Sequence, residues 1–208
     1  YGCLVGSEMC IRDRYFNFHL GMTGGWSENN IKHCHFKVNA EDRQLFFRDV
    51  RKFGKMRILN KEQIQQRHFK TYDFLNKDYD FDEHMNYLKQ KVSHSKSVCS
   101  TLMDQRFFPG VGNYIKSEAL YAAKLHPEKQ WGKLSSKKVK ELLLATKDIM
   151  QRSFASGGAE LKDFKNPFHV SKFELKVYGN KEDGYGNEVV SSTTSDQRKS
   201  WYCPKVQK

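Results

Sequence analysis

The chain has 208 residues, which is enough for one large domain or two small ones. With 38% apolar residues it is not expected to be disordered throughout, and no apolar run approaches the roughly 20 residues of a membrane span. The 36 Lys and Arg exceed the 24 Asp and Glu, and the net charge of +12 predicts a polyanionic partner: nucleic acid first, an anionic membrane surface second. A basic protein without such a partner is the alternative.

The cysteines argue against two kinds of cross-link. There are five, an odd number, and no two of them form a C-x-x-C pair. A disulfide framework and a zinc cage are therefore both disfavoured, and a reduced intracellular compartment is expected.

The first fourteen residues, YGCLVGSEMCIRDR, have neither helical nor strand periodicity. They resemble a translated sequencing adapter. We therefore treat residues 1–14 as foreign and predict no element of the fold there.

The next part of the chain is predicted to be rich in strands, because aromatic and polar residues alternate in it. A glycine-rich turn is expected at 21–25, and the strands at 15–20, 33–38, 45–50 and 54–59. Residues 43–70 carry nine Lys and Arg against two acids, whereas 73–83 carry five acids against one lysine. This change of sign predicts a domain boundary.

Helical spacing of apolar residues begins near Asp82. Ser135 or Ser136 is expected to cap the last helix, which Gly157 and Gly158 end. The part that follows, 172–208, is predicted to be strand-like again. The expected helices cover 83–92, 97–105, 113–125 and about 136–154.

The segment PGVGNYIKSEALYAAKLHP (109–127) places two glycines directly before a predicted helix that opens at Asn113. A helix N-terminus offers backbone N–H groups and a positive dipole end, which suit a phosphate, and Asn113 adds a side-chain donor. The alternative is an ordinary connection between two helices.

Two further segments, HLGMTG (19–24) and FRDVRKFGKM (47–56), are expected to form neighbouring loops. Their tips carry Met22, Arg51 and Phe53. Apolar side chains beside an arginine suit a wedge that enters a base stack and fills the gap left by an extruded base. The alternative is that Met22 and Phe53 pack into the core.

The C-terminal segment DQRKSWYCPKVQK (196–208) interleaves basic residues with Trp201 and Tyr202. Such a pattern suits contact with a nucleic-acid backbone. A basic hairpin with a packed Trp201 is the alternative.

These motifs, in this order, resemble the formamidopyrimidine-DNA glycosylase and endonuclease VIII (Fpg/Nei) family. The resemblance covers 15–208 and includes SGGAELKDF as a further motif. It implies an α+β fold: the end of a β-sandwich (15–75), a helix–two-turns–helix DNA-binding domain (83–160) and a C-terminal β-hairpin finger (172–208).

The resemblance also implies site residues. Asn113 matches the family's phosphate-gripping asparagine, and Arg198 matches the arginine of the finger hairpin. Arg106 and Lys199 complete the expected DNA-binding set. The wedge opposite the flipped base corresponds to Met22, Arg51 and Phe53, and the loop near the everted base (156–164) contains Gly157 and Gly158.

The family excises oxidised bases and cleaves the strand at the abasic site, through an imine between a secondary amine and sugar C1′. Its nucleophilic proline, adjacent glutamate and early-strand lysine would precede Tyr15, where the adapter-like residues stand. The resemblance therefore implies no catalytic residue in this chain. Lys52 or Lys116 would be able to form an imine, but nothing marks either as having a depressed pKa.

Zinc-bearing members place two C-x-x-C pairs in the finger. Here the first pair is absent, and in the second only Cys203 remains, with Val206 at the other position. We therefore expect a zincless finger, no metal and no cofactor. His33, Cys34 and His35 alternate on one strand without a partner pair and are not expected to bind a metal.

The resulting expectation is a base-excision repair glycosylase with abasic lyase activity in the full-length protein. Its partner is damaged double-stranded DNA, and a monomer located with DNA inside the cell, without a membrane partner, is expected. Two alternatives stay open: a non-catalytic damaged-DNA-binding protein, and a basic module that binds RNA.

Overall fold

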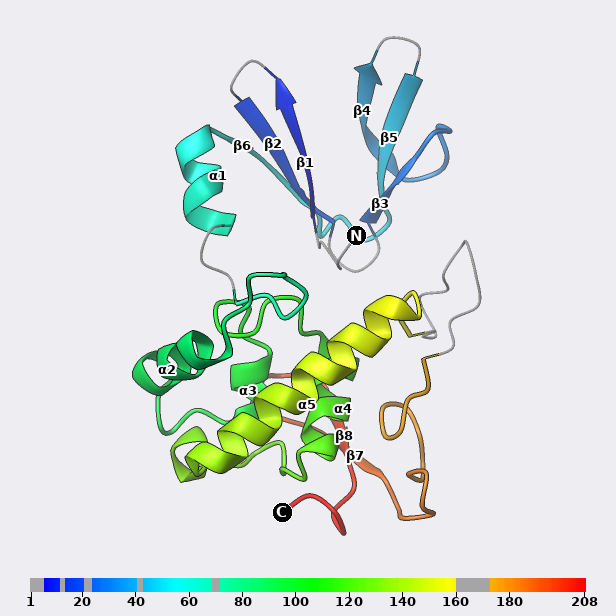
Figure 1. Ribbon diagram of the computed structural model, residues 1–208. Coiled ribbons are helices and arrows are strands. Elements are labelled where there is room, and N and C mark those ends of the chain that lie inside the picture. The colour runs from blue at the N-terminus through cyan, green and yellow to red at the C-terminus, as the bar shows by residue number, and fades with distance from the viewer. Residues whose placement is uncertain (1–5, 12–13, 21–23, 41–42, 69–71, 160–172) are drawn as a thin grey trace. The chain divides into compact units, whose positions relative to one another are not determined.

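The computed structural model describes residues 6–11, 14–20, 24–40, 43–68, 72–159 and 173–208. It divides near residue 70 into two compact units, which we call unit 1 (to Lys70) and unit 2 (from Thr71). Strands dominate the first and helices the second, so the expected α+β class is confirmed (Figure 1). Among the described residues, no helix is both long enough and apolar enough to cross a membrane.

Unit 1 contains two antiparallel sheets of three strands each, in the orders β1-β2-β6 and β3-β5-β4. An aromatic cluster joins them, because the ring of Phe18 on β2 lies 5.0 Å from Trp26, 5.4 Å from Phe36 and 5.6 Å from Phe47 on the other sheet. The strands are β1 (Gly6–Ile11), β2 (Arg14–His19), β3 (Gly24–Ser27), β4 (Cys34–Ala40), β5 (Arg43–Asp49) and β6 (Lys55–Leu59).

The expectation that residues 1–14 form no element was wrong for 6–11. This segment is strand β1, paired with β2 from Gly6↔His19 to Ile11↔Arg14. Strand pairing uses main-chain groups, so an available strand edge accepts an extended segment that has no side-chain periodicity. Strand β3 was also missed, since the glycines at 24 and 25 indicated a turn.

Helix α1 (Lys61–His68) contradicts the expectation that helices begin only near Asp82. Its N-terminus carries a reciprocal cap: Asn60 Oδ1 accepts from Gln63 N at 2.8 Å, and Gln63 Oε1 accepts from Asn60 N at 3.0 Å. This capping-box pattern is readable in the sequence. It was missed because the helix has little apolar periodicity.

Unit 2 is a helical bundle with a short hairpin. Ser135, not Ser136, caps α5, accepting from Lys138 N at 3.3 Å. In the region expected to be strand-like, the predicted hairpin is present as β7 paired with β8, and the other described residues there form turns and loops. The elements are α2 (Phe81–Lys91), α3 (Val98–Leu102), α4 (Asn113–Ala122), η1 (Trp131–Lys133), α5 (Ser136–Ala155), β7 (Val190–Thr193) and β8 (Lys199–Tyr202).

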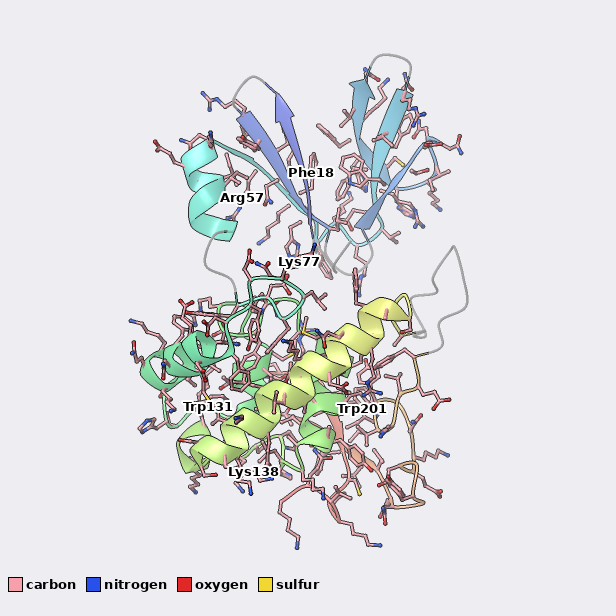
Figure 2. All side chains as sticks on the ribbon, in the orientation of Figure 1. Phe18, Arg57, Lys77, Trp131, Lys138 and Trp201 are labelled. Atoms are coloured by element: carbon pink, nitrogen blue, oxygen red, sulfur yellow. The ribbon has the colours of Figure 1, made fainter. Side chains whose placement is uncertain are left out.

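Helices α4 and α5 pack antiparallel, since Tyr114 meets Ser153 at one end and Lys138 Nζ meets the Ala123 carbonyl at the other. The core between the helices is continuous and includes Trp131 (Figure 2). A firm core of this kind fixes the start of α4 and the surfaces around it.

Candidate nucleic-acid interface

The loop before α4 is shaped to present the start of the helix. Gly110 has φ +78°, a conformation that favours glycine, and its N–H donates to Gln105 Oε1 at 3.0 Å. The same Gln105 side chain donates to the Val111 carbonyl at 3.0 Å. Because the N-cap is Gly112, no N-cap side chain accepts from the N–H groups of the first turn. The positive end of the helix dipole therefore lacks a capping side chain of its own.

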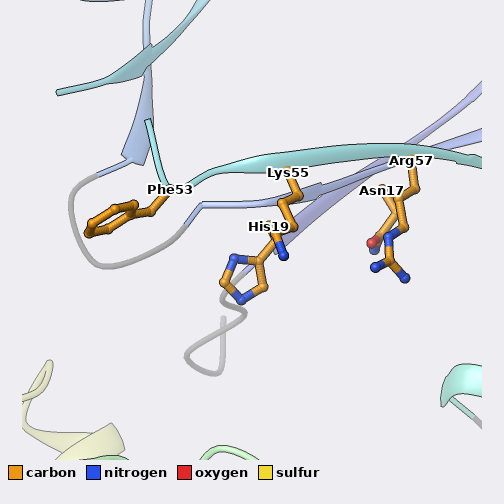
Figure 3. A pocket seen from close by; sticks show the side chains of 5 residues that line it. All are labelled: Asn17, His19, Phe53, Lys55 and Arg57. Atoms are coloured by element: carbon orange, nitrogen blue, oxygen red, sulfur yellow. The ribbon is translucent and has the colours of Figure 1, made fainter. Parts of the chain in front are cut away.

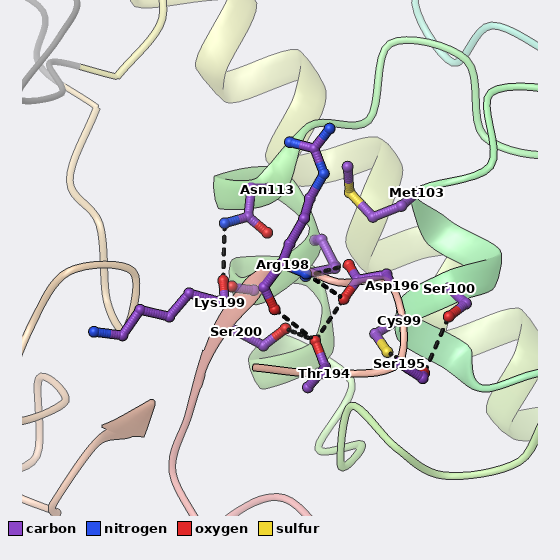
Figure 4. Close-up of polar contacts among 12 residues, drawn as sticks. Cys99, Ser100, Met103, Asn113, Thr194, Ser195, Asp196, Arg198, Lys199 and Ser200 are labelled. Atoms are coloured by element: carbon purple, nitrogen blue, oxygen red, sulfur yellow. Dashed lines mark hydrogen bonds and ion pairs between the residues drawn. The ribbon is translucent and has the colours of Figure 1, made fainter. Parts of the chain in front are cut away.

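Asn113 ties this helix end to the C-terminal hairpin. Its Nδ2 donates to the backbone carbonyl of Lys199 at 2.9 Å, across 86 residues of sequence (Figure 4). Its Oδ1 is buried and has no hydrogen-bond partner among the described residues. An amide nitrogen carries two donor hydrogens, so the bond to Lys199 leaves one for another acceptor.

The turn that carries Arg198 is fixed through its backbone. The Arg198 carbonyl accepts from Thr194 N at 3.0 Å, and its N–H donates to Asp196 Oδ1 at 3.3 Å. Asp196 in turn pairs with Lys116 Nζ at 2.7 Å, with both side chains almost fully buried. Burial alone would raise the pKa of Asp196, but the hydrogen bonds from Lys116, Thr194 and the Arg198 N–H, together with the Lys116 charge, lower it below its usual range. The side chain of Arg198 is exposed, and the backbone of its turn is connected through Asp196 to Lys116 on α4 (Figure 4).

Arg106 and Lys199 are both exposed, but each has a local partner. Arg106 makes two hydrogen bonds to Asp104, at 3.0 and 2.7 Å, and this contact is the main cause that lowers the pKa of Asp104. Lys199 Nζ lies 5.5 Å from the centre of the Trp201 ring, a cation–π contact. A DNA phosphate would have to share Arg106 with Asp104.

The end of α5 is closed by two glycines with positive φ, +79° at Gly157 and +91° at Gly158. The N–H of Gly158 donates to the Ser153 carbonyl at 2.7 Å. Two consecutive left-handed residues explain why glycines end the helix. The rest of the predicted lesion loop, residues 160–164, lies outside the described residues.

In unit 1, Phe53 is 62% exposed and Arg51 lies 5.3 Å from its ring centre. The alternative that Phe53 packs into the core was therefore wrong. The buried Asp49 carboxylate accepts from Gly54 N at 2.6 Å, and a Cβ on Gly54 would approach that oxygen to 2.8 Å. The loop behind Phe53 therefore has little room for another residue at Gly54. Met22 lies outside the described residues.

A hollow beside Phe53 was not anticipated. Its other lining residues are Asn17 and His19 on β2 and Lys55 and Arg57 on β6 (Figure 3). The sequence did carry the signal, because Lys55 and Arg57 alternate along one strand and therefore share a face.

The finger does not offer a metal site among its described residues, and its thiol is unsuited to one. Cys203 is fully buried against Tyr121, Val177 and Val189. No group of three or more His, Cys, Asp or Glu able to hold a metal occurs in the described parts of the chain. A single thiol in an apolar cluster does not fit a structural zinc.

Two carboxylates organise the loops of the finger through hydrogen bonds. Glu118 Oε1 accepts from Val177 N and Tyr178 N, both at 2.9 Å, and Oε2 accepts from Lys176 N at 3.0 Å. Asp183 accepts from the Tyr121 hydroxyl at 2.9 Å and from the N–H groups of its own turn. Both carboxylates organise loops through bonds to α4.

Two other groups weighed from the sequence are already engaged. A ring nitrogen of His35 lies 3.0 Å from the Asp49 carbonyl. Lys116 Nζ forms an ion pair with Asp196, so its amine is not available to form an imine. The other lysine considered for an imine, Lys52, is exposed and has φ +56°.

A family model described as "Formamidopyrimidine-DNA glycosylase H2TH domain" matches residues 71–165. The formamidopyrimidine-DNA glycosylase of Zymomonas mobilis is 31% identical over 220 residues, with all of this chain and 78% of that protein covered. The Rickettsia bellii protein of the same name is 32% identical over 207 residues, covering 91% and 73%. The chain belongs to the formamidopyrimidine-DNA glycosylase (Fpg) family.

Solved Fpg structures agree with this assignment. Lactococcus lactis Fpg in complex with DNA containing an abasic site matches with a TM-score of 0.79 and 26% identity, covering 95% of this chain and 76% of that one. The Thermus thermophilus Fpg structure matches with a TM-score of 0.80 at 24% identity and supports the fold alone.

Proposed function

We propose that this Fpg-family chain acts in base-excision repair, binding damaged double-stranded DNA for removal of oxidised bases and cleavage at the abasic site. The observation that carries the proposal is the Asn113–Lys199 hydrogen bond of 2.9 Å. It joins a helix N-terminus suited to a phosphate to the hairpin that presents Arg198. Two phosphate-binding groups from distant parts of the sequence are thereby held on one surface.

Backbone binding is assigned to unit 2 in this proposal. Asn113 and Arg198 contact phosphates of the damaged strand, and Arg106 and Lys199 extend the contact. The loop that begins at Gly157 and Gly158 lies near the extruded base.

Recognition of the damaged position is assigned to the loops of unit 1. Met22, Arg51 and Phe53 fill the space left in the base stack. The exposure of Phe53 supports this role, because a ring that is 62% exposed is accessible for stacking against a DNA base.

The finger belongs, in this proposal, to the zincless subgroup of the family. The buried Cys203 and the hydrogen bonds of Glu118 and Asp183 support this assignment. A metal chelator should therefore leave both the thermal midpoint and the affinity for abasic duplex unchanged. A fall in either on chelation would contradict the assignment.

The test is the salt dependence of binding to a duplex with a tetrahydrofuran abasic analogue. Arg198→Ala should reduce the log–log salt slope by about one, the value for one phosphate contact. Lys181→Ala, an exposed lysine of the same finger, should leave the slope as it is. An unchanged slope in Arg198→Ala would remove Arg198 from the interface.

Cleavage is measured separately. Incubation with a natural abasic duplex, with and without borohydride, reports strand scission and a trapped imine. Binding with scission supports the glycosylase and lyase, whereas binding without either supports a damaged-DNA-binding protein. Equal affinity for RNA hairpins and abasic duplex would instead favour the RNA-binding module. We further propose a monomer that is located with DNA inside the cell, and light scattering with and without duplex tests the monomer.

A further inference from the structure

The hollow in unit 1 is a cationic site built from two paired strands. His19 pairs directly with Lys55, and Asn17 pairs with Arg57, across the antiparallel β2–β6 ladder. Residues two apart on a strand point to the same face, so the four side chains form a two-by-two array with rows about 6.7 Å apart. The hollow between them and Phe53 has a volume of about 380 Å³ (Figure 3).

The two longest side chains of this array, Lys55 and Arg57, are cations. Among the described residues, no carboxylate lines the hollow and no ion pair includes Lys55 or Arg57. Both side chains are exposed. The opposite face of the same strands carries Phe18 and Met56, which are themselves a cross-strand pair. The sheet therefore separates an apolar face from a cationic one.

We infer that this hollow binds two successive phosphates of one DNA strand, one held by Lys55 and the next by Arg57. The planar guanidinium of Arg57 matches a phosphate in a two-bond arrangement, and the Lys55 ammonium supplies a point charge. Phe53, at the rim, then adjoins the nucleotide that these phosphates flank. This inference rests on the proposed function, and it adds to it a backbone contact that fixes the strand at the wedge.

The test compares two double variants with equal loss of charge. Lys55→Gln/Arg57→Gln removes the hollow's cations, and Lys61→Gln/Lys89→Gln removes two exposed lysines elsewhere. Against abasic duplex, the first should reduce the log–log salt slope by about two, because each phosphate contact contributes about 0.9. The second should leave the slope close to that of the unaltered chain.

A chemical arm locates the contact without altering the protein. Neutral methylphosphonates are placed one at a time along each strand of the abasic duplex. For the unaltered chain, two adjacent positions on one strand near the lesion should weaken binding, and the Lys55→Gln/Arg57→Gln variant should no longer respond at those two positions. Inorganic phosphate in place of DNA should not compete at millimolar concentration.

Three results would overturn the inference: equal slopes for the two double variants, sensitivity that persists at the same positions in the hollow variant, or displacement of DNA by millimolar phosphate. Failure of the proposed function is distinguishable, because the unaltered chain would then show no preference for abasic over intact duplex.

Discussion

Unit 2 buries nineteen apolar side chains in one cluster, whereas the described part of unit 1 buries only Phe18, Phe47 and Leu59. Unit 1 also leaves large apolar side chains in the open, with Met56 46% and Ile58 54% exposed. Yet both units present cations proposed to meet the same polyanion. In unit 2, the turn that carries Arg198 is fixed by buried polar contacts to a well-packed helical core. In unit 1, Lys55 and Arg57 lie on the exposed face of a three-stranded sheet that has few buried apolar side chains beneath it.

The largest effect is expected in unit 1. Phe18 is 2% exposed and is the ring that joins the two sheets. Phe18→Ala should cost about 3–5 kcal/mol, which is comparable to the whole stability of a small domain. Hydrogen exchange should then show unprotected amides in β2 and β5 but unchanged protection in α4 and α5. Leu45→Ala, at a side chain 40% exposed, is the control. Loss of protection in both units would mean that they do not fold separately.

Unit 2 offers a matching test at its buried ion pair. Lys116→Met leaves the carboxylate of Asp196 buried without its cation, which should cost about 3–5 kcal/mol of unfolding free energy. Urea unfolding measures this cost, with Lys133→Met, at an exposed position, as control. Binding should weaken in parallel, because the turn that carries Arg198 loses its anchor. A neutral result would show that the pair is dispensable.

The helical core also predicts a pH dependence. His84 is fully buried, with Nδ1 2.9 Å from the Tyr79 hydroxyl and Nε2 2.8 Å from the Phe107 carbonyl. Burial lowers the pKa of His84 to about 4. In the unfolded chain His84 has a pKa near 6.5. Between about pH 4 and 6.5, His84 is therefore protonated in the unfolded chain and neutral in the folded one.

Stability should accordingly fall by about 3 kcal/mol as the pH drops from about 6.5 to about 4. The measurement is urea unfolding across that range. His84→Gln should flatten the profile, and the exposed His94→Gln should not. A flat profile in the unaltered chain would show that His84 titrates normally.

A smaller effect is expected where the finger meets α4. Glu118→Gln replaces one acceptor oxygen of a three-bond cluster by a donor, which should cost about 2 kcal/mol. Thermal unfolding with Glu182→Gln, at an exposed finger residue, as control measures it. Equal midpoints in the two variants would mean that the hydrogen bonds of Glu118 contribute little and that apolar packing around Cys203 holds the finger.

The sequence predicted the helices of unit 2 well, because their caps and apolar periods are local. Gly157 and Gly158 end α5 as expected, and Ser135 caps it. Contacts across the chain were not predictable in this way. Nothing in the spacing of Asn113 and Lys199 indicates their hydrogen bond, and nothing around Lys116 or Asp196 indicates a buried pair. Such contacts depend on how α4 meets the hairpin.

Unit 1 was predicted less well for a related reason. Strand β1 is held by main-chain pairing, which leaves no period in the sequence, and α1 is held by a cap instead of an apolar face. Predicting the hollow would have required the pairing register of β2 and β6, which places His19 beside Lys55. Alternation along one strand predicts a face, but not which strand lies next to it.

The smallest effect on stability is expected at the wedge, where a substitution should change DNA binding without changing the free energy of unfolding. Phe53→Ala removes a ring that is 62% exposed, so unfolding should change by no more than about 0.5 kcal/mol. Preference for abasic over intact duplex should nevertheless fall, because no ring then fills the gap in the stack. Competition binding with both duplexes measures this ratio, and Leu144→Ala, at an exposed position of α5, is the control. Equal losses of affinity for both duplexes would make Phe53 a general DNA contact. A large loss of unfolding free energy would mean that Phe53 contributes to the packing of unit 1.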